Sequence, residues 1–93
     1  MKVGICVLEL LIFGSRSLKD KRQVVKSLKD RIRHKFNVSI AEVDAHDLRQ
    51  RAALGIACVA CDTQNANSVL SNVINFIEQS CVTEINHYEI EII

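Results

Sequence analysis

The sequence contains no proline, no tryptophan and only three glycines among its 93 residues. Flexible linkers and collagen-like chains are rich in glycine or proline, so the composition excludes both classes. Aromatic residues are also scarce, with three Phe and one Tyr, and this argues against recognition of single-stranded nucleic acid by base stacking. A chain this short builds one small core, and we expect a single domain over residues 1–93.

Long apolar runs are missing as well. No run reaches the roughly 18 apolar residues that a membrane span requires. The most apolar stretch, residues 3–12, is interrupted by Glu9 and is followed by no signal-peptide cleavage motif. We therefore expect a cytoplasmic protein with no membrane partner.

The four cysteines lack the spacing of a metal centre. Cys58 and Cys61 form a C-x-x-C, but they fall in a stretch with the pattern of a strand. Residues three apart on a strand point to opposite faces, so the two thiols cannot bind one ion together. We expect free cysteines in a reducing compartment, and no metal or other cofactor.

Positive charge is absent from the second half of the chain. Residues 1–51 hold all twelve Lys and Arg residues and six acids, whereas residues 52–93 hold five acids and no base. Nine of the twelve bases lie within residues 15–36. Such an asymmetry within a chain of net charge +1 suits attraction of an anionic partner or self-association.

Hydrophobic periodicity predicts six elements. Residues 3–12 are apolar on both alternating sets, which indicates a central strand. Residues 18–36 carry apolar side chains at the period of a helix, behind a capping-box-like Ser17 and Asp20. The remaining elements are strands at 38–44 and 54–62, a helix from 63 to 80 and an edge strand at 82–93, with one helical turn starting at Asp47 in the connection between the middle strands.

The order β-α-β-β-α-β is that of the ferredoxin-like fold. Right-handed crossovers put both helices on the same side of the sheet. We therefore expect an α+β, ferredoxin-like βαββαβ sandwich, in which two helices cover one face of a four-stranded antiparallel sheet.

The other sheet face is then left uncovered and apolar. We predict that it forms the contact in a homo-oligomer, because exposed apolar patches commonly mark contacts. The residues assigned to this face are Ile5, Val7, Leu11, Ala57 and Val59. Glu9 shares the face, so we expect either that it lies at the rim of a dimer interface or that an Arg from residues 49–51 pairs with it.

The first helix is densely basic. Its Lys and Arg residues recur at spacings of three and four, which gathers them in one stripe beside the apolar face. We predict that they contact phosphates of structured RNA or of a ribosomal particle. The residues assigned to this surface are Arg16, Lys19, Lys21, Arg22, Lys26, Lys29 and Arg33. The alternative is that the stripe meets an acidic protein surface, as in a homo-oligomeric structural or regulatory module.

Two further segments carry polar residues that suit chemistry. Ser15, Arg16 and Ser17 precede a helix N-terminus and could hold one anion, which leaves open a small phosphate-ester or acyl-phosphate hydrolase; ordinary helix capping explains the same residues. The polar segment 42–51 provides no nucleophile with a base and an orienting group. We therefore assign no catalytic residue and expect no enzyme.

Two segments, GSRSLKDKRQVVKSL and FNVSIAEVDAHDLRQRAALGIA, resemble the signature segments of the YlxP-like family, a bacterial family of unknown function. The resemblance covers nearly the whole chain and implies a ferredoxin-like cytoplasmic protein with no established activity. It also implies a ribosome-associated role, because genes of this family often lie near genes for translation initiation and ribosome maturation factors. The matching residues include Asp44, Asp47, Gln50 and Arg51, whose role is unknown.

Overall fold

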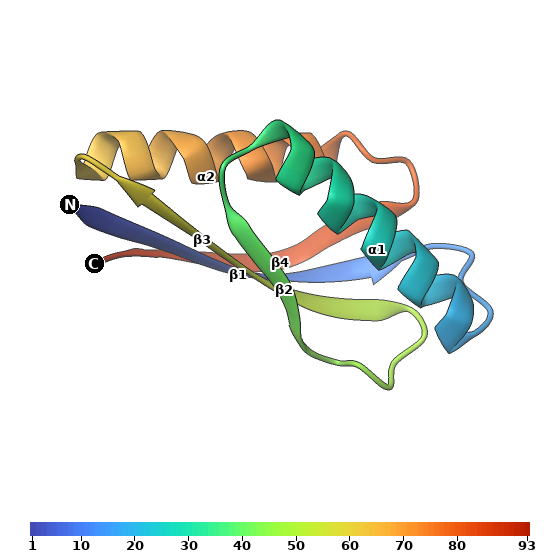
Figure 1. Ribbon diagram of the computed structural model, residues 1–93. Helices are drawn as coiled ribbons and strands as arrows, with labels where there is room; N and C mark the ends of the chain where they lie inside the picture. Colours follow the sequence, from blue (N-terminus) through green and yellow to red (C-terminus); the bar gives the residue numbers. More distant parts are fainter.

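The computed structural model covers residues 1–93 and contains all six expected elements. They are β1 (Lys2–Ile12), α1 (Leu18–Lys35), β2 (Ser39–Asp44), β3 (Arg51–Ala60), α2 (Thr63–Glu78) and β4 (Thr83–Ile92). The strands form one antiparallel sheet in the order β2-β3-β1-β4, and both helices lie on the same side of it (Figure 1). The predicted ferredoxin-like fold is confirmed. Neither helix is long and apolar enough to cross a membrane.

β1 is central because it is apolar on both sides. It pairs with β3 along one edge and with β4 along the other. Cys6, Leu8 and Leu10 point toward the helices and are fully buried in a core of 17 apolar residues. Each Leu or Ile side chain placed there stabilises the fold by about 1.5–3 kcal/mol.

α2 lies over β1, β3 and β4. Its N-cap is Asp62, whose carboxylate accepts a hydrogen bond from the Asn65 amide at 2.8 Å. The helix approaches β1 closely at Gly4, where an added Cβ would lie 3.0 Å from Leu70 Cδ1. A larger residue at this crossing would require Leu70 and Cys58 to move by a few tenths of an ångström.

α1 begins as the capping pattern predicts, since the Ser17 hydroxyl accepts the Asp20 amide at 3.1 Å. It ends one residue earlier than expected, with Phe36 as its C-cap. The helical turn expected from Asp47 is wrong: the segment forms a turn in which the Leu48 amide donates to the Ala45 carbonyl at 3.1 Å. Ala45 takes a left-handed φ of 61° there, a conformation uncommon for residues other than glycine.

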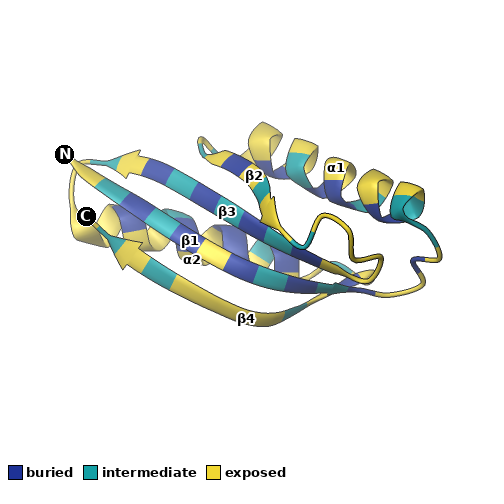
Figure 2. Ribbon diagram, turned by 90° about the horizontal axis from the view of Figure 1, so that it is seen from below, coloured by how far each residue is buried: buried dark blue, intermediate teal, exposed yellow.

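The sheet side away from the helices is uncovered, and we call it the open face; Figure 2 looks onto it. Directly opposed residues of neighbouring strands share a face. The register therefore places on the open face Val3, Ile5, Val7, Glu9 and Leu11 of β1, Arg51, Ala53, Gly55, Ala57 and Val59 of β3, and Glu84, His87, Glu89 and Glu91 of β4. All five residues predicted for the uncovered face lie on it.

The burial of the four cysteines predicts which thiols react in the folded protein. Cys61 and Cys81 are exposed, whereas Cys6 and Cys58 are buried. Burial also raises the pKa of the Cys6 thiol to about 11, which suppresses the reactive thiolate. We expect a disulfide reagent at pH 8 to label two thiols in the folded protein and all four in denaturant, as counted by absorbance or mass. Labelling of three or four thiols at one rate in the folded protein would contradict this packing.

Candidate nucleic-acid interface

Five of the eight Lys and Arg residues of α1 lie on one flank, four of them exposed and Lys29 half-buried. The helix buries Val25, Leu28 and Ile32 against the sheet, and at about 100° per residue the predicted cations fall beside that buried face. This basic stripe consists of Lys19, Arg22, Lys26, Lys29 and Arg33. The Arg33 guanidinium donates to the Ile40 carbonyl of β2 at 2.8 Å, so the stripe runs along the side of α1 that faces the β2 edge of the sheet.

The opposite flank of α1 packs against α2. Lys35 lies 5.0 Å and Arg31 6.0 Å from the centre of the Phe76 ring. Phe36 meets the same ring edge to face at 5.8 Å. The cations of this flank are thus engaged with aromatic rings, whereas those of the basic stripe are not.

Most of the charge on the basic stripe is uncompensated. Lys19, Arg22 and Lys29 form no ion pair. Asp30 is the acid that pairs with the stripe, with Lys26 at 2.7 Å in an exposed i,i+4 contact and with Arg33 at 3.7 Å. That hydrogen bond from Lys26 holds the pKa of Asp30 below its usual value. Exposed ion pairs are weak, so Lys26 remains available to an anion that binds it more tightly than Asp30 does.

The prediction of a phosphate contact is wrong for Lys21, because its side chain is fully buried. Its ammonium forms an ion pair with Glu42 Oε2 at 2.7 Å. It also donates to the carbonyls of Ala45 at 2.6 Å and His46 at 3.4 Å. Lys21 therefore joins α1 to the end of β2 and to the following turn.

The sequence contains a signal for this ion pair that charge alone does not reveal. Lys21 follows Leu18 by three residues and precedes Val25 by four, so it falls on the apolar stripe and not on the basic one. Glu42 alternates with Ile40 on β2, which directs it to the same side. Two opposite charges at apolar positions of facing elements predict a buried ion pair.

The loop before α1 is organised as a helix cap. Ser15 Oγ donates to the Ser17 carbonyl at 3.2 Å, and the Arg16 amide donates to the Asp20 carboxylate at 3.3 Å. An anion bound at Ser15, Arg16 and Ser17 would meet that carboxylate. The contacts support the capping interpretation, and the anion site is not retained.

The two segments that carried the family resemblance touch each other in space. Arg49 Nη1 donates to the Arg16 carbonyl at 3.1 Å, and this contact adds to those of Lys21. Asp44 accepts the Ala45 amide at 2.8 Å, while the Gln50 carbonyl accepts the Ile12 amide at 2.8 Å. These contacts shape the turn between β2 and β3, and the Asp47 side chain is exposed beside it.

Glu9 pairs with an arginine. This is one of the two arrangements expected for it, the other being a place at the rim of a dimer interface. Arg51 Nη1 lies 2.9 Å from Glu9 Oε1, and the Asn86 side chain approaches the same oxygen at 3.5 Å. Since β3 begins at Arg51 opposite Leu11, the pair spans the sheet surface near the end of β1. It neutralises the one carboxylate that lies within the apolar part of the open face.

The buried ion pair generates a stability prediction. Removing one member of such a pair leaves an unpaired buried charge and costs about 3–5 kcal/mol, so Lys21→Met should lower the free energy of unfolding by about that amount. The exposed control Lys26→Met should change it by less than about 1 kcal/mol. Urea denaturation followed by circular dichroism measures both. Lys21→Met/Glu42→Leu should recover much of the loss, and equal effects of the two single changes would refute the role of Lys21.

Known proteins resemble this chain along most of its length. A family model described as a protein of unknown function (DUF503) matches residues 3–90. The uncharacterised protein YlxP of Bacillus subtilis (strain 168) is 38% identical over 76 residues, which cover 82% of this chain and 83% of that protein. A solved structure, the de novo designed protein LFR1 1 with ferredoxin fold, is 14% identical with a TM-score of 0.49, over 100% of this chain and 83% of that one. By the match of its family model, this chain belongs to the DUF503 family of proteins of unknown function.

Proposed function

We propose that this protein is a non-enzymatic accessory factor that binds structured RNA, alone or within a ribosomal particle, through the basic stripe of α1. One observation carries the proposal: five Lys and Arg residues share one flank of a helix, and Asp30 is the one acid that pairs with them. Sequence-independent affinity for nucleic acid comes mainly from such phosphate contacts. With Lys21 removed, the contacting set is Arg16, Lys19, Arg22, Lys26, Lys29 and Arg33.

The position of the stripe supports a helical RNA target. Lys19 and Arg33 are fourteen residues apart, so the stripe extends for about 21 Å along α1. Its cations lie on successive turns of one rigid element, which suits the regular phosphates of a duplex. Stacking of unpaired bases is carried mainly by exposed aromatic rings, and the open face carries no Phe or Tyr.

The second candidate is the protein-binding module in which the stripe meets an acidic surface, including that of another copy. It is favoured by the acidic second half of the chain. Both candidates predict salt-sensitive binding, so RNA must be tested directly. Binding to an acidic protein surface would persist after ribonuclease treatment of the partner, whereas binding to RNA would not.

Two double variants with the same charge change test the RNA proposal. Lys26→Gln/Lys29→Gln alters the stripe, whereas Arg31→Gln/Lys35→Gln alters the flank that faces α2. We expect the first variant to weaken co-sedimentation with purified ribosomal subunits across a salt series. The slope of log affinity against log salt should flatten by about 0.7 to 0.9 for each phosphate that the variant no longer neutralises, and the second variant should retain the slope of the parent.

Two choices in the design make the outcome decisive. Arg33 is left intact because it also binds the Ile40 carbonyl. Poly(U) serves as the unstructured RNA and should bind more weakly than the subunits. Equal weakening in the two variants would indicate attraction by net charge alone, and a parent that binds neither probe at low salt would refute the proposal.

A further inference from the structure

The open face combines an apolar strip with an acidic margin. The strip runs along β1 and β3, where Val7 is 48% and Val59 is 67% exposed. On β3 the residues between Arg51 and Val59 that share this face are Ala53, Gly55 and Ala57. Ala53 and Ala57 add little height to the strip, and at Gly55 the exposed Val43 side chain of β2 lies against the β3 backbone. Exposed apolar surface of this kind is typical of contact sites.

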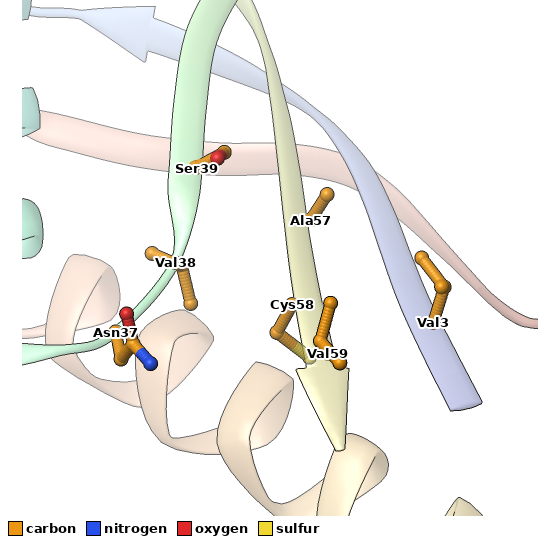
Figure 3. Close-up of a pocket in the computed structure, with 7 residues that line it drawn as sticks. All are labelled: Val3, Asn37, Val38, Ser39, Ala57, Cys58 and Val59. Atoms are coloured by element: carbon orange, nitrogen blue, oxygen red, sulfur yellow. The ribbon is translucent and has the colours of Figure 1, made fainter. Parts of the chain in front are cut away.

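The strip ends in a hollow. This hollow, of about 230 Å³, lies between the start of β2 and the end of β3 (Figure 3). Val3, Ala57 and Val59 of the open face line it together with Val38 and Cys58. Because β2 pairs with β3 only as far as Ser39 opposite Ala57, the end of β3 extends beyond β2 and leaves this space. A hollow with mainly apolar walls suits one bulky apolar side chain from a partner.

The margin of the face is negative. The register places Glu91 opposite Ile5, Glu89 opposite Val7 and Glu84 opposite Leu11. All three glutamates are exposed. Arg51 is engaged by Glu9 on the same face, and the chain has no Lys or Arg beyond it. His87 lies 3.3 Å from Glu89, so it opposes that charge only when protonated.

This charge decides between the possible occupants. A second copy docked face to face would add a second acidic margin and no unpaired cation, and clustered like charges oppose such a contact. A second copy could instead dock through the basic stripe of its α1, which would supply cations. The residues of that stripe are charged, so they would not bury the apolar strip of the open face. The complementary occupant carries apolar and basic side chains together.

The dimensions suit a helix. Strands are spaced by about 4.8 Å, so β3 and β4 lie about 10 Å apart across β1, which is close to the diameter of about 10–12 Å of a helix with its side chains. We infer that the open face docks a basic amphipathic helix of another protein, with its apolar stripe over β1 and β3 and its Lys and Arg residues over the glutamates of β4. This site is separate from the basic stripe of α1.

A synthetic peptide tests the inference. The probe is an 18-residue helix with a Leu stripe flanked on one side by Lys, a length that spans about 27 Å, and the control is a scrambled peptide of the same composition. Fluorescence anisotropy gives the affinity, and amide chemical shifts map the site. We expect the probe to perturb β1, β3 and β4, and to bind at least about tenfold more tightly than the control.

Variants assign the binding to the open face. Val7→Lys and, independently, Val59→Ser alter the strip at exposed positions, and Glu89→Lys/Glu91→Lys reverses the margin. Each should weaken probe binding by about tenfold or more, while Lys26→Gln/Lys29→Gln should leave it within about twofold, since that pair is remote. Thiol protection of Cys6 and Cys58 reports that each variant is folded.

Three results would overturn the inference. The first is equal affinity for the probe and the scrambled peptide, which would reduce the effect to charge attraction. The second is a set of shifts confined to α1 and β2. The third is a parent that sediments as a dimer and that Val7→Lys makes monomeric, because a second copy would then be the occupant.

Discussion

One buried ion pair, between Lys21 and Glu42, joins α1 to the end of β2. A charge inside a protein is tolerated only when its partners replace water, and the ammonium of Lys21 has three of them: the Glu42 carboxylate and the carbonyls of Ala45 and His46. Together with the buried Val25, Leu28 and Ile32, the pair fixes the rotation of α1 about its axis, and it holds the turn after β2. Through that rotation it determines which flank of α1 presents cations to solvent.

The same rotation divides the charge of the chain between two surfaces. The basic stripe lies beside the β2 edge on the helix side of the sheet. The glutamates of β4 lie at the opposite edge, on the open face. A chain of net charge +1 thus presents a cationic surface and an anionic one, on different elements and different sides. The proposed functions follow from this separation: RNA at the first surface and a basic helix at the second would leave both free to act at once.

The sequence predicted the fold because its patterns are local and strong. The two-sided apolar pattern of residues 3–12 predicted a central strand, and the structure has β1 between β3 and β4. The open face followed from the period of two in each strand. An Arg from residues 49–51 was one of the two outcomes predicted for Glu9, because a carboxylate within an apolar face is costly unless it is paired, and Arg51 is that partner.

The site was predicted less fully, because it depends on which elements become neighbours. Lys21 was grouped with the exposed cations by its charge, although its position on the apolar stripe indicated burial. The turn at Ala45 was expected to contain helix, and its left-handed φ of 61° follows from contacts that lie far apart in the sequence. The gathering of β4 glutamates beside the apolar strip depends on the register with β1, which includes an irregularity after Glu9 that no local pattern indicates.

Lysine labelling with an acetylating reagent, with and without bound ribosomal subunits, tests the central claim most directly. The six lysines sample the start of β1, the buried ion pair and both flanks of α1: Lys2, Lys19, Lys21, Lys26, Lys29 and Lys35. The account predicts that Lys21 is unlabelled in both states, that labelling of Lys19, Lys26 and Lys29 falls in the complex, and that Lys2 and Lys35 are unchanged. Undiminished labelling of Lys26 and Lys29 in a sedimenting complex, or ready labelling of Lys21 in the free protein, would contradict it.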